Sequence, residues 1–237
     1  MTAVELRSVS RTFRTAAEVV RAVREVSFRA STGEFVCVYG PSGSGKSTLL
    51  NLIAGLDLAD DGEVVVAGQA LGSLDEDARA LLRLRSVGMV FQDDALIEEF
   101  TAAENVALAL EARGVKSGAA LSEAEMRLAA VGLEGLGPRR PDQLSGGQRQ
   151  RVGIARALAG GRRIIVADEP TGSLDSETSA RLFELITELC RGGVLAIVCS
   201  HDPLCADYAD SVYEMTDGRL RVVLASAGPR QPTGASA

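Results

Sequence analysis

The segment Gly40–Ser47 has the residue types and spacing of a phosphate-binding loop, because it fits the pattern G-x4-G-K-[ST] in full. Glycines let successive backbone N–H groups turn inward around phosphate oxygens. Lys46 would place a positive charge at the β- and γ-phosphates, and the Ser47 hydroxyl could bind Mg²⁺. The residues expected to contact phosphate or nucleotide here are Gly40, Pro41, Ser42, Gly43, Ser44, Gly45, Lys46, Ser47 and Thr48. The alternative is a Gly/Ser surface loop with an incidental lysine.

The residues on either side of the loop favour the phosphate-binding interpretation. Phe35–Tyr39 (FVCVY) is continuously apolar, which is typical of a strand buried on both faces. After the loop, leucine and isoleucine recur at the spacing of an amphipathic helix, at Leu49, Leu52, Ile53 and Leu56. The positive N-terminal end of that helix would point at the same anion.

Two adjacent acids, Asp168 and Glu169, follow another apolar run, Ile164–Ala167. The carboxyl ends of parallel strands open into the ligand crevice of an α/β sheet. One carboxylate there could hold Mg²⁺ through its water ligands, and a second could orient or deprotonate a water. Acids after strands also serve as helix caps, so the pair becomes specific only in combination with the phosphate loop.

The segment Leu144–Gln148 (LSGGQ) is a second candidate anion site. Ser145 and Gln148 have the spacing of a capping box, so the segment could be only a helix start. A helix N-terminus that offers a serine hydroxyl and two glycines, Gly146 and Gly147, is also suited to binding an anion.

Buried strands that alternate with helices predict an α/β fold with a largely parallel sheet. Beyond the two apolar runs above, Val194–Cys199 (VLAIVC) is a further buried strand, and an amphipathic helix is expected over 182–189. Near the N-terminus, Val4–Val9, Val19–Val23 and Val26–Phe28 have the mixed polarity of half-exposed antiparallel strands.

The middle of the chain is expected to be helical. Thr101 with Glu104, and Ser122 with Glu125, have the spacing of capping boxes that open helices. We expect one domain over 1–225, with its core at about 1–92 and 160–225 and a helical subdomain at about 93–159. Residues 226–237 (SAGPRQPTGASA) lack periodicity and are expected to form a flexible tail.

Composition limits the partners and the compartment. The 237 residues carry 25 basic and 32 acidic side chains, and the net charge of −7 argues against nucleic acid as a partner. The four cysteines lack C-x-x-C spacing, which favours buried thiols in a reducing compartment. The chain shows neither a secretory signal nor an apolar run long enough to span a membrane, so we expect a cytoplasmic protein.

With these motifs in order, the sequence over about 4–224 resembles the ATP-binding subunit of an ABC transporter. LSGGQRQRVGIARAL, at 144–158, is similar to that family's signature motif and the helix after it. The resemblance implies a P-loop NTPase (RecA-like) core with an N-terminal antiparallel β subdomain and an inserted α-helical subdomain. It also implies ATP hydrolysis, with ATP and Mg²⁺ as the bound groups.

The resemblance assigns roles beyond the phosphate loop, in which Lys46 is also expected to act in catalysis. Asp168 corresponds to the Walker B aspartate, which would hold Mg²⁺ together with Ser47, and Glu169 corresponds to the catalytic glutamate. Gln92 matches the glutamine that contacts Mg²⁺ and the membrane-domain interface, and it is also expected to act in catalysis. His201 matches the histidine that contacts the γ-phosphate, and Asp175 belongs to the D-loop, which meets the opposite subunit.

Phe13 lies where the family stacks an aromatic ring on adenine. Tyrosine is commoner at that position, but phenylalanine keeps the stacking face; the alternative is an ordinary core aromatic. DEPTGSLDS, FQ followed by TAAENV, and PSGSGKSTLLNLIAGLD look most like the subgroup that serves lipoprotein-releasing, macrolide-exporting and cell-division ABC systems.

The resemblance implies a homodimer in which each ATP lies between the Lys46 loop of one subunit and Ser145–Gln148 of the other. It also implies a separate transmembrane permease, which would hold the protein peripherally at the cytoplasmic face of the membrane during export or extraction of a substrate. Soluble relatives that act on DNA or ribosomes are disfavoured, because no coiled coil, zinc module or second ATPase domain is present. An ATP-gated scaffold that regulates envelope or cell-division enzymes without transport stays open, since its ATPase chemistry would be the same.

One stretch departs from the family pattern by its acidity, with Asp93, Asp94, Glu98 and Glu99 close together. Such a run is most often a solvated face. Our sharper hypothesis is that these acids form part of a groove that receives a basic coupling helix of the permease.

Overall fold

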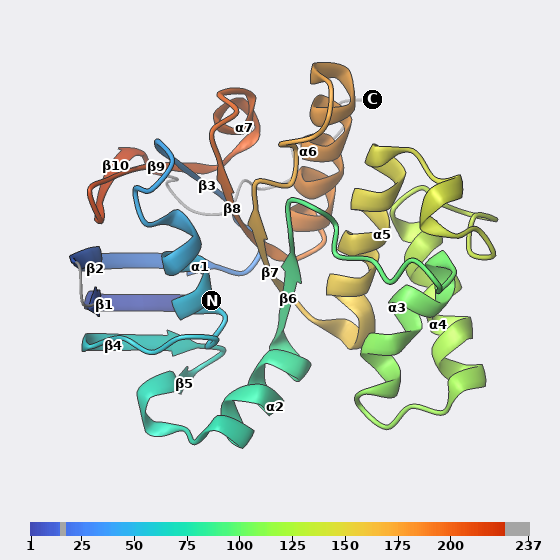
Figure 1. Ribbon diagram of the computed structural model, residues 1–237, viewed down its shortest axis with the longest axis horizontal. Coiled ribbons are helices and arrows are strands. Elements are labelled where there is room, and N and C mark those ends of the chain that lie inside the picture. Colours follow the sequence, from blue (N-terminus) through green and yellow to red (C-terminus); the bar gives the residue numbers. More distant parts are fainter. Residues whose placement is uncertain (15–17, 226–237) are drawn as a thin grey trace, which may run out of the picture.

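Two β-sheets with helices packed around them make up the protein, seen in a computed structural model that describes residues 1–14 and 18–225 (Figure 1). The tail expected at 226–237 lies outside the described residues. The smaller sheet is antiparallel and has the strand order β2-β1-β4-β5. Its strands are β1 (Thr2–Arg14), β2 (Val19–Ser31), β4 (Asp61–Val66) and β5 (Gln69–Ala70).

The larger sheet has the strand order β10-β9-β3-β8-β7-β6. Its strands are β3 (Phe35–Tyr39), β6 (Val87–Val90), β7 (Ile164–Asp168), β8 (Leu195–Ser200), β9 (Ser211–Thr216) and β10 (Arg219–Leu224). All neighbours are parallel except β9 and β10, which pair antiparallel. The predicted α/β fold with an antiparallel β subdomain is therefore confirmed.

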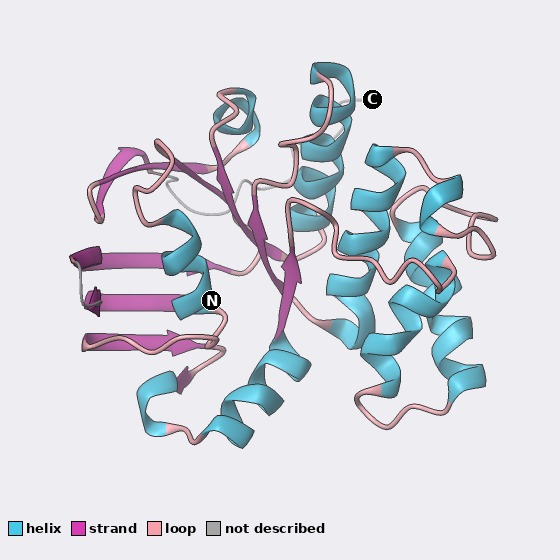
Figure 2. Cartoon of the chain, in the orientation of Figure 1, coloured by secondary structure: helices cyan, strands magenta, loops and turns pink. Residues whose placement is uncertain are grey.

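The helices are distributed over both sheets, as Figure 2 shows. They are α1 (Lys46–Ile53), α2 (Glu76–Ser86), α3 (Ala102–Glu111), α4 (Ser117–Ala130), α5 (Gly146–Leu158), α6 (Ser176–Arg191) and α7 (Leu204–Tyr208), with single 3-10 turns η1 (Leu71–Ser73), η2 (Pro141–Gln143) and η3 (Ala159–Gly161). In Figure 1, α3, α4 and α5 lie together on one side of the larger sheet and the smaller sheet lies on the other. None of the helices in the described ranges is both long and apolar enough to cross a membrane.

The apolar runs form strands of the larger sheet because both of its faces are covered. Alternate residues of β3 enter different hydrophobic clusters. Phe35 and Cys37 pack with residues of α3, α4, α5 and α6, whereas Val36 and Val38 pack with residues of the smaller sheet and α1. The central strands are thus fixed from both sides.

The parallel register brings the carboxyl ends of three strands to one edge of the sheet. Tyr39 at the end of β3 pairs with Ser200 at the end of β8, and Asp168 at the end of β7 pairs with Cys199. The loops that follow these strands therefore start close together, although they are far apart in the sequence.

Two local predictions are wrong. Ser122 does not cap a helix, because α4 already begins at Ser117 and the Ser122 hydroxyl donates to the Gly118 carbonyl at 3.0 Å. The helix starts earlier because it buries small side chains before Ser122, including Ala120. The two runs expected in 19–28 are one continuous strand, β2. The Thr101–Glu104 capping box of α3 is confirmed.

Candidate functional site

The phosphate-loop motif occupies the connection between β3 and α1, at the edge where the parallel strands end. Gly40 and Gly45 have φ values of 158° and 106°. A Cβ at Gly40 would overlap the Met215 carbonyl, and one at Gly45 would overlap the Ala22 carbonyl, so only glycine fits at these two positions. Gly45 is also the N-cap residue of α1 and supplies no side-chain cap, which leaves backbone N–H groups at the start of that helix for an anion.

Lys46 places its ammonium group inside this loop. Nζ donates to the carbonyls of Gly40 at 2.8 Å and Pro41 at 3.2 Å, and lies 3.8 Å from Oε1 of Glu169. The hydroxyl of Ser44, in the same loop, is buried and has no hydrogen-bond partner in the described part of the chain. A buried cation and an unpaired buried hydroxyl are suited to binding the oxygens of a phosphate group.

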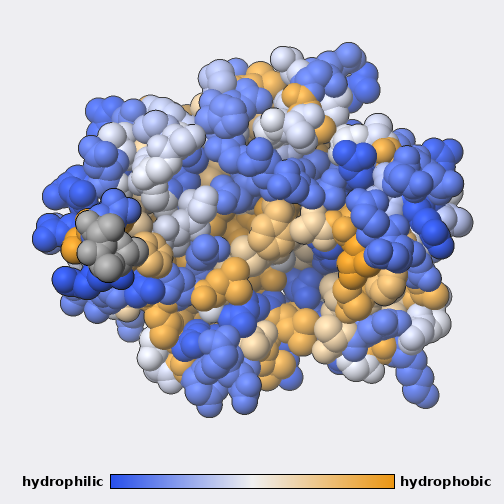
Figure 3. Space-filling model, in the orientation of Figure 1, coloured by the Kyte–Doolittle hydropathy of each residue, from blue (hydrophilic) through white to orange (hydrophobic). Residues whose placement is uncertain are grey.

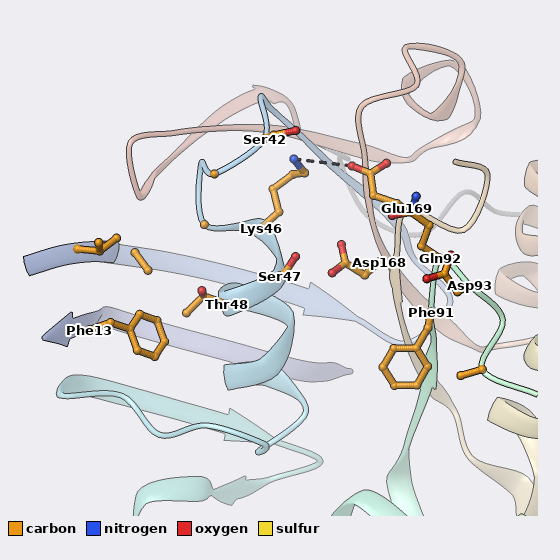
Figure 4. A pocket seen from close by; sticks show the side chains of 15 residues that line it. Phe13, Ser42, Lys46, Ser47, Thr48, Phe91, Gln92, Asp93, Asp168 and Glu169 are labelled. Carbon is orange, nitrogen blue, oxygen red and sulfur yellow. Dashed lines mark ion pairs between the residues drawn. The ribbon is translucent and has the colours of Figure 1, made fainter. Parts of the chain in front are cut away.

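A cleft of about 680 Å³ opens beside the loop (Figure 4). Of the residues proposed from sequence, it is lined by Phe13, Ser42, Gly43, Gly45, Lys46, Ser47, Thr48, Gln92, Asp168 and Glu169. The cleft is also lined by Val20, Ala22, Phe91 and Ala95, which the sequence did not indicate, and by Asp93, which was expected at a permease contact instead. Figure 4 shows Ser47 on α1 and Asp168 at the end of β7 pointing toward one another across the cleft.

Glu169 is fixed in the cleft by an unusual backbone conformation. Its φ of 49° is uncommon for a residue other than glycine. Its N–H donates to the Cys199 carbonyl at 2.8 Å, and its Oε2 accepts a hydrogen bond of 3.0 Å from the backbone N–H of His201. Nδ1 of His201 lies 2.8 Å from the same oxygen. The predicted catalytic glutamate and the predicted γ-phosphate histidine are therefore in direct contact.

The segment that follows β6 carries Gln92 and is held from α5. The buried Gln150 donates through Nε2 to the carbonyl of Gln92 at 2.7 Å and to that of Phe91 at 3.1 Å. Two arginines of α5 hold the next residues, since Arg149 pairs with Asp94 at 2.9 Å and Arg156 donates to the Asp94 carbonyl at 2.7 Å.

These three α5 side chains position the segment over 91–95, and sequence reasoning missed them. Only the two arginines gave a signal, because residues 149 and 156 are seven positions apart and so share a face of one helix. The pairing of Asp94 with Arg149 also means that this acid is not part of an exposed acidic face.

The signature segment lies outside the cleft. Ser145 is the N-cap of α5, and it forms a capping box with Gln148 through bonds of 3.0 and 3.3 Å. None of the residues from 145 to 148 lines the cleft. A Cβ at Gly146 would lie 3.3 Å from Leu174, so the signature segment packs beside the D-loop residues.

Asp175 in that D-loop caps α6. Its Oδ1 accepts from the Thr178 backbone N–H at 2.8 Å, and this bond is the main reason that its pKa is lowered. Asp175 does not line the cleft either. The structure therefore brings together the phosphate loop, the two strand-end acids, Gln92 and His201, and holds the signature and D-loop residues apart from them.

Comparison with known proteins identifies the family of the chain. The sequence profile of the ABC transporter family matches residues 23–172. The lipoprotein-releasing system ATP-binding protein LolD of Anaeromyxobacter dehalogenans is 43% identical, over 98% of this chain and 96% of that protein. The macrolide export ATP-binding/permease protein MacB of Wolinella succinogenes is 42% identical over 92% of this chain, which spans only 34% of MacB.

A solved structure is also similar. The ATP-binding cassette MJ0796, in a dimeric post-hydrolysis state bound to ADP and Pi, matches with a TM-score of 0.84 and 38% identity, covering 96% of this chain and 99% of that one. The sequence analysis expected relatives among lipoprotein-releasing and macrolide-exporting systems. LolD belongs to the first kind of system and MacB to the second, so this expectation is confirmed. From its motifs, its fold and these relatives, the chain belongs to the ABC transporter family as an ATP-binding subunit that hydrolyses ATP.

Proposed function

We propose that the chain binds ATP with Mg²⁺ in the cleft beside Lys46, and hydrolyses it as a nucleotide-sandwich dimer that drives a partner membrane permease. The observation that carries this proposal is the position of Glu169, whose carboxylate lies 3.8 Å from the ammonium of Lys46 and 2.8 Å from the ring of His201. A carboxylate held between a phosphate-binding cation and a histidine is suited to acting on a water beside the terminal phosphate.

The oxygen groups that line the cleft fit a magnesium ion. Ser47 offers a hydroxyl, Asp168 a carboxylate and Gln92 an amide oxygen, and Mg²⁺ prefers few protein oxygens together with phosphates and waters. No three His, Cys, Asp or Glu side chains converge as metal ligands in 1–14 and 18–225, and the proposed site uses one carboxylate, that of Asp168. When bound, Mg²⁺ would neutralise charge on the β- and γ-phosphates.

The roles of the chain's own residues follow from their contacts. Glu169 would polarise the attacking water. With Nδ1–H of His201 donating to Glu169, the protonated form of the ring would donate through Nε2–H to the γ-phosphate. Lys46 would move from the loop carbonyls to the developing charge on the phosphate oxygens. Phe13, which is 40% exposed at the cleft, would stack on adenine.

The remaining motifs would act across a dimer interface. The N-terminus of α5 with Ser145, and the neighbouring D-loop with Asp175, do not line the cleft of their own chain. We therefore propose that they contact ATP held by a second copy, which supports a head-to-tail homodimer. The similar cassette MJ0796 is itself described as dimeric.

A groove of about 340 Å³ between α2, β6, α3 and α5 is the proposed contact with the permease. Its lining includes apolar residues together with Arg83, Arg156 and Arg162. Figure 3 shows hydrophobic side chains on this side of the surface, where α2 and α3 also carry the exposed Leu81 and Leu108. Neither Glu98 nor Glu99 lines the groove, so these two acids would meet the permease beside it. Such docking would place the protein at the cytoplasmic face of the membrane. The name of the relative MacB includes both ATP binding and a permease, so in that protein the two functions belong to one chain.

The test of this mechanism is Glu169→Gln. The amide keeps the size of the side chain but cannot accept a proton, so ATP binding should persist while turnover falls by about 100-fold or more. Phosphate release measures turnover, and light scattering with ATP present should show a trapped dimer.

Glu184→Gln on the exposed side of α6 is the matched control and should keep the parent rate and the parent oligomeric state. Hydrolysis by Glu169→Gln at the parent rate would show that the catalytic assignment is wrong.

A further inference from the structure

The ring of Phe13 is backed by a cation on its own strand. Arg11 and Phe13 are two residues apart on β1, so their side chains share a face of the smaller sheet. The Arg11 guanidinium lies over the Phe13 ring, with its central carbon 4.9 Å from the ring centroid. This distance is within the range of an attractive cation–π contact.

Arg11 is held rigidly by two carboxylates. Its Nε and Nη2 reach the two oxygens of Asp57 at 2.9 and 2.8 Å, and its Nη1 reaches Asp60 at 2.7 Å. The other oxygen of Asp60 accepts from the Thr12 backbone N–H at 2.6 Å. A bidentate carboxylate fixes the plane of a guanidinium as well as its position.

These carboxylates connect the ring to the phosphate loop. Asp57 and Asp60 belong to the segment between α1 and β4, which follows directly on the helix that Lys46 begins. The Asp60 backbone N–H also donates to the Ser10 carbonyl of β1 at 2.8 Å. The position of Phe13 is therefore set relative to α1 through Arg11.

The two faces of the ring have different surroundings. Phe13 lines the nucleotide cleft and Arg11 does not, so the guanidinium covers the ring from outside the cleft. Phenylalanine has no hydroxyl through which a hydrogen bond could fix the ring. The cation and its two carboxylates supply that restraint and leave one aromatic face toward the cleft.

We propose that Arg11 is a positioning residue for the nucleotide base, which it orients by clamping Phe13 so that the free face of the ring stacks on adenine. The inference rests on the proposed binding of ATP in this cleft. A ring fixed before binding loses less conformational entropy when the base stacks on it. Arg11 would therefore strengthen the binding of nucleotides and leave the binding of phosphate groups without a base unchanged.

The experiment compares ADP with inorganic pyrophosphate as probes, using calorimetry on the full chain. Arg11→Ala should raise the Kd for ADP about 5-fold to 10-fold, which is the range of a partly desolvated cation–π contact, and leave the Kd for pyrophosphate unchanged. In steady-state assays, the KM for ATP should rise while kcat stays the same. In a Phe13→Ala background, Arg11→Ala should have no further effect, because the ring through which it acts is absent.

Two variants separate this role from a structural one. Arg7→Ala on the same strand removes a guanidinium that pairs with Glu5 and Glu63, away from the ring, and should not change either Kd. Arg11→Lys keeps a cation beside the ring and should bring the Kd for ADP to within about threefold of the parent value.

The outcomes distinguish this inference from the proposed function. If Phe13→Ala weakens ADP binding and Arg11→Ala does not, the role of Arg11 is refuted and the adenine site stands. Equal weakening of ADP and pyrophosphate by Arg11→Ala, or no recovery in Arg11→Lys, would also refute it. If Phe13→Ala itself leaves ADP binding unchanged, adenine does not stack there and the proposed binding mode fails first.

Discussion

The Glu169 side chain is held in place before any reaction begins. A non-glycine residue with a φ of 49° is strained, and such strain persists only where neighbouring contacts impose it. Here the contacts are the bond of its N–H to the Cys199 carbonyl and the two contacts of its carboxylate with His201. The carboxylate is thereby aimed into the cleft, and the proposed hydrolysis would need no reorganisation of it.

The two lysines of the chain allow a clean test of the phosphate site. Lys46→Met keeps the length of the side chain and removes its charge, so the Kd for ADP should rise about tenfold or more because a charge-assisted contact is lost. Lys116→Met is the control, because Lys116 is exposed at the start of α4. Calorimetry measures both, and a similar loss in the two variants would contradict a specific role for Lys46.

The parts of the site that short motifs define could be predicted from sequence. Lys46, Asp168 and Glu169 are recognised because neighbouring residues in the sequence carry the chemistry. Arg11 and Gln150 could not be predicted in the same way, because the groups that fix them lie at least 46 residues away along the chain. Only the folded structure shows that Gln150 holds the carbonyls of Phe91 and Gln92.

The helices and strands differ in how clearly the sequence pattern predicts them. β3, β7 and β8 were predictable because burial on both faces demands continuous apolar residues. The helix α2 was not predicted, since it buries only Leu82 and so lacks a strong apolar stripe. The early start of α4 depends on small residues, whose burial leaves little periodic signal.

Contact between β6 and α5 depends on a residue without a side chain. A Cβ on Gly88 would lie 2.6 Å from the Cβ of Ala157 and overlap the Ala157 carbonyl. Gly88→Ala should therefore force β6 and α5 apart and lower the free energy of unfolding by about 1–3 kcal/mol, as overpacking does. Urea denaturation measures the change.

Gly72→Ala provides the control, because a Cβ there meets nothing within 4 Å and the backbone is not in the left-handed region. It should leave the free energy of unfolding within about 0.5 kcal/mol of the parent value. A Gly88→Ala protein as stable as Gly72→Ala would mean that this close packing is not maintained in solution.

On the scale of the whole molecule, the four acids that follow Gln92 serve different purposes. Asp93 lines the nucleotide cleft and Asp94 pairs with Arg149, which leaves Glu98 and Glu99 exposed. The sequence could show that the acids are clustered, but not that Asp93 lines the cleft or that Asp94 pairs with an arginine of α5. The hypothesis of a basic permease surface therefore narrows to Glu98 and Glu99.

Reversing both charges, in Glu98→Lys with Glu99→Lys, should abolish or strongly reduce permease-stimulated ATPase activity, because like charges would then face one another. ATPase activity without the permease should not change. The matched control reverses two other exposed acids, Glu111 and Glu134, and should keep the stimulation. Full stimulation of the Glu98/Glu99 variant would refute the acidic contact.

The buried thiols have a practical consequence. Cys37, Cys190, Cys199 and Cys205 are free and at most 3% exposed. Burial raises the pKa of Cys190 to about 12 and that of Cys199 above its usual range, so little reactive thiolate forms near neutral pH. A cysteine introduced at position 98 would then be the one accessible target for maleimide dyes or spin labels. Distances from the proposed permease contact at Glu98 could then be followed during turnover in the otherwise native sequence.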